Sequence, residues 1–429
     1  MKVPAVKGTR DFYPPLMARR NYLVDGWKAA SNRNGFEEYD GPIFEYLKMY
    51  QIKSGDEIVD QLFSLQDRGG RDLAIRPEIT PTLARMVNQQ IHALPRPIKW
   101  FSVPRLCRAE RPQKGRLREF FQWNIDIIGA EDLLADAEVI CCALDYLQST
   151  GLTADDVVVR ISSRRMLAEM LKAIGIAEDQ LDSLYPLLDK MGRMAPDAFE
   201  AALGDLIPDA DPLDKILDLM QAKRLEQVSE GLTMTGPAQD SVEELSRLFD
   251  LLDRMGVADF CRFDISVVRG LAYYTGVVFE IYDRGCELRA LGGGGRYDNL
   301  LKQFGGPQVT ATGLGMGDCV LAILLEEKGL LAGRVPTRSL DYYVACVDKQ
   351  YFPQAVEIVA RIRRAGRRAN LSYRQTGLGK QLKQASEQNA TEAVIVGAEI
   401  ESQQVAVKAL ASGEQRVVAV DQFFAGLQG

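Results

Sequence analysis

Histidine is almost absent from this sequence, which contains a single one, His92, among 429 residues. A site built from several imidazole ligands is therefore excluded, and so is a Ser-His-Asp triad built on any other histidine. His92 lies in NQQIHALPRP, just before two prolines, and this context predicts a surface position at the end of a helix. Chemistry in this protein must rely on carboxylates, arginines, tyrosines and bound ligands.

Cysteine pairs at metal-binding spacing are also missing. The seven cysteines are scattered and never form a C-x-x-C pair, which argues against a disulfide framework and against a zinc site. No run of about 18 apolar residues occurs, and the opening MKVPAVKGTRDFYPP is charged where a secretory signal has an apolar core. These absences favour a cytoplasmic protein without a membrane span, and no side chains are assigned to a metal.

The composition that is present is that of an ordinary globular protein, with 46% hydrophobic and 26% charged residues and a formal net charge of -7. Helical and strand patterns mix over residues 1–150, whereas residues 165–250 are acidic and helical, with little strand signal. Strand-like segments then return, which predicts a helical insertion within one core over residues 1–330. Strand and helix alternate again over residues 338–429, which predicts a separate α/β unit.

An arginine-rich segment at residues 108–120, RAERPQKGRLREF, stands out in this acidic chain. Strand-type composition on both sides, with Pro112 and Gly115 between, predicts that the segment is the tip of a hairpin. Arginine suits phosphate, because its guanidinium fork matches two phosphate oxygens at once. A solvated, charged hairpin is the alternative, and this segment alone favours neither.

Several segments together resemble one family. RAERPQKGRLREFFQWNIDIIG resembles motif 2 of the class II aminoacyl-tRNA synthetases in its histidyl form, and VVRGLAYYTGVVFE and GGGGRYDNLL resemble the two histidine-specific signatures of histidyl-tRNA synthetases. KGTRDFYP, RPEITPTLARMV and a C-terminal unit similar to a class IIa anticodon-binding domain extend the resemblance over nearly the whole chain. It implies an α+β class II core, with an antiparallel sheet flanked by helices and a helical insertion, followed by a C-terminal α/β anticodon-binding domain.

The resemblance implies ATP-dependent activation of L-histidine to histidyl-adenylate and transfer to the 3′ end of tRNA(His), with Mg²⁺ as cofactor. Activation needs no general base, because an α-carboxylate with a pKa of roughly 3.5 is already ionised at neutral pH. The site has to hold this carboxylate in line with the ATP α-phosphate and to neutralise charge that grows on the phosphoryl oxygens. Arginines and Mg²⁺ supply that charge, so a chain with one histidine is no obstacle.

The family's catalytic roles fall on Arg108 and Arg269, which are expected on opposite sides of the α-phosphate and near the histidine carboxylate. The positions implied for ATP are Arg108, Glu110, Arg116 and Phe120, with Phe120 stacked on adenine. Plain core packing is the alternative for Phe120.

The positions implied for histidine fall into two groups. One group gathers the α-ammonium, which offers three donors and needs acceptors. The other supplies partners for the two imidazole nitrogens, Asp126 and Tyr274. Thr80 also stands where a helix N-cap is expected, with Pro81 at the first helical position, and Tyr273 and Tyr297 are alternatively ordinary core aromatics. The whole implied set is Glu78, Thr80, Arg108, Gln122, Asp126, Arg269, Tyr273, Tyr274 and Tyr297.

Two positions depart from the family pattern, which has Asp where this chain has Ala272 and a motif 3 arginine where it has Val320. In most class II enzymes that arginine holds the γ-phosphate of ATP, so the departure at Val320 concerns how this chain binds the phosphates of ATP. The same pair of changes resembles a bacterial and plant-organellar type of the family.

RNA binding is expected in spite of the acidic net charge. Residues 361–383 contain eight Lys or Arg and no Asp or Glu, and backbone phosphates respond to such a local basic face; a solvated helix end is the alternative. Arg111 and Gln113 match positions that face the tRNA acceptor end. Pro42 matches the motif 1 interface proline, so the resemblance also implies a homodimer, although a turn proline would look the same.

The alternative function is that of a catalytically silent paralogue, such as the regulatory subunit of ATP phosphoribosyltransferase. Such paralogues generally lack the C-terminal anticodon unit and carry degraded histidine signatures. This sequence has the C-terminal unit and both histidine signatures, which favours the synthetase.

Overall fold

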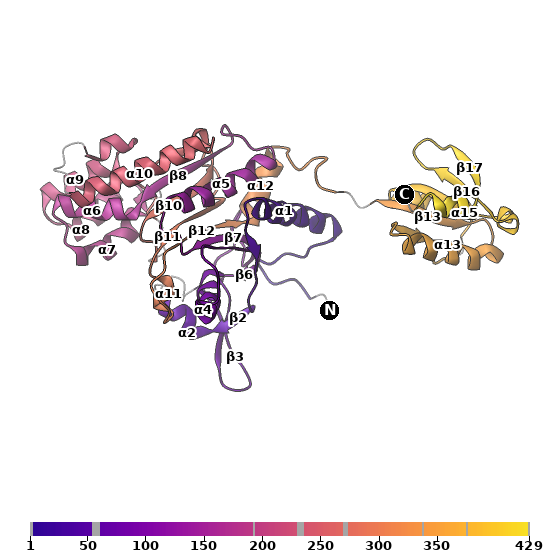
Figure 1. The fold of residues 1–429 in the computed structure, drawn as a ribbon, viewed down its shortest axis with the longest axis horizontal. Helices are drawn as coiled ribbons and strands as arrows, with labels where there is room; N and C mark the ends of the chain where they lie inside the picture. The colour runs from indigo at the N-terminus through magenta and orange to yellow at the C-terminus, as the bar shows by residue number, and fades with distance from the viewer. Residues whose placement is uncertain are drawn as a thin grey trace. The chain divides into compact units, whose positions relative to one another are not determined.

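The computed structural model describes residues 3–53, 61–191, 194–229, 236–268, 273–336, 339–374 and 376–427. The chain forms two compact units, Met1–Val335 and Pro336–Gly429, and each has its own hydrophobic core (Figure 1). None of the helices within the described ranges has both the length and the apolar character needed to cross a membrane.

A nine-stranded sheet forms the centre of the first unit. Its strands are antiparallel except at the two edges, where β1 pairs with β5 and β8 pairs with β9 in parallel. The expected antiparallel sheet flanked by helices is therefore confirmed, with a parallel pair at each edge. In order across the sheet the strands are β1 (Glu37–Glu38), β5 (Ile98–Ser102), β7 (Glu119–Ile128), β12 (Ala311–Gly317), β11 (Gly292–Tyr297), β10 (Val277–Asp283), β8 (Val157–Ser163) and β9 (Cys261–Phe263), and β6 (Arg105–Cys107) pairs with the start of β7.

Three helices pack together beside this sheet, namely α1 (Pro14–Arg33), α5 (Leu134–Ser149) and α12 (Asp318–Glu327) (Figure 1). Proline at the start of α1 suits the first helical turn, because its fixed φ is already helical. Trp27 of α1 is fully buried, with its ring centroid 6.2 Å from Trp123 of β7 and 6.0 Å from Tyr146 of α5. The Trp123 indole donates to Ser31 Oγ at 2.9 Å, so the polar atom of this buried ring has a partner.

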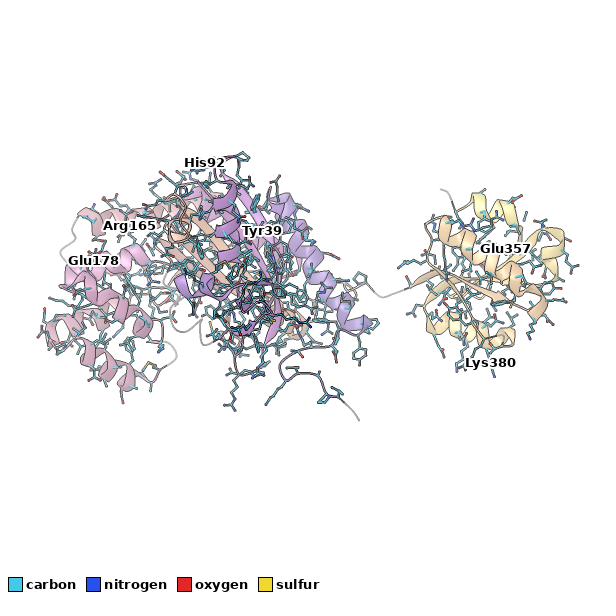
Figure 2. The ribbon with its side chains drawn as sticks, turned by 90° about the horizontal axis from the view of Figure 1, so that it is seen from below. Tyr39, His92, Arg165, Glu178, Glu357 and Lys380 are labelled. Atoms are coloured by element: carbon cyan, nitrogen blue, oxygen red, sulfur yellow. The ribbon has the colours of Figure 1, made fainter. Side chains whose placement is uncertain are left out.

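Another set of elements lies around α4 (Thr80–Gln90), which packs with α2 (Leu47–Lys53) and α11 (Leu300–Gln303). A three-stranded sheet of β2 (Phe44–Tyr46), β4 (Asp72–Ile75) and β3 (Phe63–Gln66) adjoins α2. The N-cap of α4 is Ile79, so the expected N-cap role of Thr80 is wrong: Thr80 is the first helical residue and its side chain lines a cavity. His92 is exposed just past the end of α4 (Figure 2).

The helical insertion lies between β8 and β9 and contains α6 (Arg164–Ile174), α7 (Glu178–Leu188), α8 (Pro196–Leu206), α9 (Ala210–Met220), η2 (Leu225–Ser229), α10 (Gly236–Arg254) and η3 (Ala258–Phe260). Local signals delimit its first helix, because Ser163 Oγ accepts the Met166 amide at 3.2 Å and Gly175 ends the helix with a φ of 108°. Its apolar faces join the main core of the unit.

The second unit is a five-stranded sheet with helices, in the strand order β14-β13-β15-β16-β17. Strand β13 (Leu340–Cys346) is parallel to its two neighbours, β14 (Ala369–Leu371) and β15 (Ala390–Val396). The sheet continues antiparallel with β16 (Gln404–Ala409) and β17 (Gln415–Ala419). The connections are η4 (Lys349–Tyr351), α13 (Phe352–Arg364), α14 (Leu378–Glu387), η5 (Ala398–Ser402) and α15 (Val420–Ala425). Buried Gln381 of α14 accepts the Cys346 amide at 3.1 Å and donates to the Cys346 carbonyl at 2.9 Å, which ties α14 to the end of β13.

A buried ion pair joins the sheet to α5 in the first unit. Arg296 of β11 donates to both carboxylate oxygens of Asp136 of α5, and the Asp136 side chain is fully buried. Arg296 also donates to the carbonyls of Ala130 and Asp132, each at 3.0 Å, and to Thr310 Oγ1 at 2.7 Å. Burial raises the pKa of the Asp136 carboxyl, and the Arg296 charge opposes that rise.

We expect Asp136→Ala to destabilise the first unit by about 3–5 kcal/mol, because it leaves a buried guanidinium without its carboxylate. The measurement is urea unfolding followed by tryptophan fluorescence, since all three tryptophans, Trp27, Trp100 and Trp123, lie in this unit. The control is Asp145→Ala, which removes a half-exposed partner of Arg33 and should cost about 1 kcal/mol or less. Equal costs for the two variants would contradict the prediction.

Candidate active site

A cavity of about 80 Å³ lies over the middle of the main sheet. Its walls come from the start of α4, from β7, β11 and β12, and from the segment before β10. The side chains at Gln122, Asn124 and Asp126 face it together, because alternate residues of β7 point to the same side of the sheet. The cavity is lined by Glu78, Thr80, Arg108, Gln122, Asn124, Asp126, Tyr273, Tyr274, Gly293, Tyr297, Gly313, Leu314 and Gly315.

Glycines on β12 make room for the polar side chains of β7. Gly313 pairs directly with Asp126, and a Cβ atom at Gly313 would clash with the Asp126 carboxylate. A Cβ at Gly315 would lie 3.0 Å from the Gln122 amide group. Only glycine therefore lets these two side chains lie across the neighbouring strand. On β11, a Cβ at Gly294 would strike the Gly313 carbonyl instead, so that glycine serves the close approach of two strands.

One end of the cavity is a carboxylate surrounded by phenols. Asp126 is buried, and the Tyr297 hydroxyl donates to its Oδ1 at 2.5 Å. Burial, followed by the Asp126 charge, raises the pKa of Tyr297 well above its ordinary value, so Tyr297 stays a donor. The Tyr273 ring lies edge-on to Tyr297, with centroids 5.7 Å apart, and 4.6 Å from the ring of Tyr274. This end suits a polar ring that donates a hydrogen bond.

The other end carries a guanidinium beside acidic and amide side chains. Glu78 and Thr80 are buried at the start of α4, beside Gln122. Arg108 follows β6, its Nε donates to the Pro77 carbonyl at 3.1 Å, and its guanidinium lies 5.2 Å from the centroid of the Phe120 ring. Acidic and amide oxygens thus lie next to a guanidinium, an arrangement that suits the ammonium and carboxylate of an amino acid.

The loop between β6 and β7 continues from Arg108 away from the cavity. Glu110 and Arg116 form a bidentate ion pair, and Arg118 Nε donates to the Glu110 carbonyl at 3.1 Å. A turn closes the loop, because the amides of Gln113 and Arg116 each bond to the carbonyl of the other, at 2.9 and 3.0 Å. Glu110, Arg116 and Phe120 are not among the residues that line this cavity, although the Phe120 ring lies beside Arg108, which does. Arg111 and Gln113 are exposed at the tip.

Two sequence-predicted positions, Arg269 and Ala272, lie outside the described residues. Val320 is buried on α12 and contacts the tip of the β6–β7 loop. In the described ranges, no group of three or more His, Cys, Asp or Glu side chains is placed to hold a metal ion.

Sequence reasoning missed two residues of the site. Asn124 lines the cavity between Gln122 and Asp126, and strict alternation along this strand was a signal that points to it. Tyr39, labelled in Figure 2, does not line the cavity but lies near enough to Asp126 to feel its charge: burial, followed by the Asp126 charge, raises the pKa of Tyr39 well above its ordinary value. Its hydroxyl is buried and has no hydrogen-bond partner among the residues that the structure describes. Nothing in the segment EEYDGP signals that position.

The basic segment at residues 361–383 lies in the second unit, over the end of α13, β14 and most of α14. Part of its charge is already engaged: Arg361 lies 3.8 Å from the centroid of the Phe424 ring, and Arg363 Nε donates to the Ala369 carbonyl at 3.0 Å. Tyr373 in the same segment is 87% exposed, which leaves an aromatic face open beside the basic residues. Such a combination suits single-stranded RNA.

Comparisons with known proteins agree with this geometry. A family model described as histidyl-tRNA synthetase matches residues 8–317, and a model described as anticodon binding domain matches residues 341–429. The chloroplastic/mitochondrial histidine--tRNA ligase of Arabidopsis thaliana is 40% identical over 410 residues, which cover 95% of this chain and 83% of that protein. The histidine--tRNA ligase of Halobacterium salinarum is 38% identical over 420 residues, which cover 97% of this chain and 96% of that protein.

A solved structure shows the same fold. The crystal structure of histidyl-tRNA synthetase from Nostoc sp. PCC 7120 matches with a TM-score of 0.81 at 24% identity, and the match covers 100% of this chain and 99% of that chain. The family model for the synthetase spans most of the first unit, and the curated relatives match along nearly the whole sequence. This chain belongs to the histidyl-tRNA synthetase family.

Proposed function

We propose that this protein activates L-histidine with ATP to histidyl-adenylate and transfers the histidyl group to the 3′ end of tRNA(His). The observation that carries the proposal is the polarity of the cavity, which has a buried carboxylate bonded to a phenol at one end and a guanidinium with acidic and amide oxygens at the other. A histidine molecule has the complementary groups in the same order. The silent-paralogue alternative is not favoured, because the anticodon-binding model matches residues 341–429.

The histidine side chain is recognised at the Asp126 end. The carboxylate accepts an N–H of the imidazole, and the hydrogen bond from Tyr297 orients that carboxylate. Tyr274, which lines the same wall, is the partner for the second ring nitrogen. Glu78, Thr80 and Gln122 take the α-ammonium.

The ATP α-phosphate lies at the Arg108 end. Arg108 is fixed by its bond to the Pro77 carbonyl, so it neutralises charge on the phosphoryl oxygens without reorganising. Arg269 contributes from the other side, by family resemblance alone. Phe120 stacks on adenine. Glu110 and Arg116, which form an ion pair, also hold ATP, with Arg116 near the terminal phosphates. Mg²⁺ bound to the ATP phosphates would supply additional positive charge beside Arg108 and Arg116.

The two units divide the work: residues 1–330 carry the catalytic domain and residues 338–429 bind the anticodon of tRNA. Exposed Arg111 and Gln113 meet the acceptor end of the same tRNA. A homodimer forms through the β2-β4-β3 face of the first unit, where an open cavity of about 750 Å³ adjoins exposed apolar side chains. The exposed apolar side chains are Ile43, Phe44 and Tyr46, which come soon after Pro42, and Leu65 on β3.

Histidine alone should support ATP–pyrophosphate exchange. A site that bonds a polar ring through buried groups rejects a side chain without them by about 10⁴-fold or more, because Asp126 and its phenols lose their partner. The measurement compares kcat/KM for exchange across all twenty amino acids. Equal exchange with glutamine or phenylalanine would refute the assignment of the Asp126 end.

Replacing Arg108 by alanine should lower the exchange rate by about 10²- to 10³-fold, because a preorganised donor to the transition-state charge is lost. The matched control is Arg105→Ala on β6, three residues before Arg108: Arg105 is half-exposed and pairs with Glu119 at 3.2 Å. That control should retain activity within a few-fold. An Arg108→Ala enzyme as active as the control would remove Arg108 from the reaction.

Truncation after Val335 should preserve histidine-dependent exchange and sharply weaken aminoacylation of tRNA(His), because the first unit has its own core and the second carries the anticodon contacts. Tryptophan fluorescence of the truncated protein checks that the first unit is folded. Undiminished aminoacylation by a folded truncation would contradict the role given to residues 338–429.

A further inference from the structure

The tip of the β6–β7 loop rests on helix α12, at the position where the family pattern has an arginine. A Cβ atom at Gly115 would lie 3.0 Å from Val320 Cγ2 and 3.9 Å from Ile323 Cδ1, so the backbone of the tip lies against Val320 with Ile323 next to it. Gly115 has a φ of 74°, which favours glycine in any case. Val320 is only 7% exposed, although it lies next to a surface loop.

An ion pair extends the contact one turn further along the helix. Lys114 Nζ lies 3.0 Å from Glu327 Oε1, and both side chains are well exposed. Val320, Ile323 and Glu327 are spaced by three and four residues, so they lie on one face of α12. We call these three residues the α12 seat.

The same helix also fixes the base of the loop. Asp318 at its start is buried, and its Oδ1 accepts the Phe121 amide at 3.0 Å, one residue after Phe120. Its Oδ2 accepts from Arg10 at 2.7 Å, which brings the N-terminal segment to the same point. Helix α12 therefore contacts the loop at its base and at its tip.

We propose that the α12 seat holds the β6–β7 loop in its ATP-binding conformation before ATP arrives, and that Val320 is a positioning residue that acts through Gly115. The inference rests on the proposed function for the role of the loop. Ordering a loop on binding weakens affinity, and a loop that is already docked avoids that loss. In this chain residue 320 supports Arg116 and Glu110 through packing and does not itself contact phosphate.

Val320→Arg separates this inference from the family pattern. An arginine at 320 has no room below Gly115 and would add a cation beside Lys114 and Arg116, so the loop tip should be displaced. We expect KM for ATP in the exchange assay to rise by about tenfold, with KM for histidine unchanged. A fall in KM for ATP would overturn the inference, because it would mean that residue 320 reaches the phosphate directly.

Loop docking is measured without catalysis by hydrogen exchange of the Gln113 and Arg116 amides in the full-length protein. Glu327→Lys should speed their exchange by about two- to fivefold, the scale of an exposed ion pair, and the double variant Lys114→Glu with Glu327→Lys should restore it. The matched control is Glu326→Lys, because Glu326 pairs with Arg19 of α1 at 3.0 Å and not with the loop. That control should leave loop exchange unchanged.

Two outcomes distinguish a failure of this inference from a failure of the proposed function. Equal loop exchange in wild type, Glu327→Lys and Val320→Arg would overturn the α12 seat, whatever the activity. A wild-type protein without histidine-dependent exchange at any ATP concentration would overturn the proposed function, while the amide exchange rates would still report whether the loop is docked.

Discussion

The two-residue period of strand β7 is the constraint on which the rest of this structure depends. Alternate residues of one strand point to opposite sides of the sheet, so Trp123 and Ile125 enter the main core while Gln122, Asn124 and Asp126 form the cavity. A shift of one residue in the pairing of β7 would turn the polar side chains toward the core and the apolar ones toward the cavity. The fully buried Trp123, stacked against Trp27, holds the register that puts Asp126 in the site.

Polar side chains can occupy the middle of a sheet only where a neighbour leaves space and a partner accepts them. Strand β12 supplies the space through Gly313 and Gly315, and Tyr297 from β11 supplies a hydrogen bond to Asp126. Beneath them, the ion pair between Arg296 and Asp136 anchors β11 to α5. The glycine-rich strands are therefore a packing requirement of the site as much as a way for a ligand to approach.

Helix α12 connects the main sheet to the β6–β7 loop. It begins at the buried carboxylate of Asp318, which continues the hydrogen bonding of β7 past the end of β12, and its exposed face carries the loop tip. Val320 lies beside Gly115 of the loop tip, at the position where the family pattern has an arginine, and the Lys114–Glu327 ion pair joins the same loop to the helix. In our proposal, a docked backbone positions the loop in this chain where the family pattern has a direct cation.

The sequence by itself determined the family, the class of fold and most of the side chains that line the cavity, because motif order and strand alternation are local properties. It also located Val320 as a departure. It did not reveal Tyr39, which comes near Asp126 only through the packing of a distant segment, or the contact of Val320 with Gly115 across 205 positions of the chain. Arg269 lies outside the described residues, so its role stays a prediction. Tertiary structure alone decided the surroundings of Tyr39 and Val320, because burial and charge at a residue depend on neighbours that only the fold brings together.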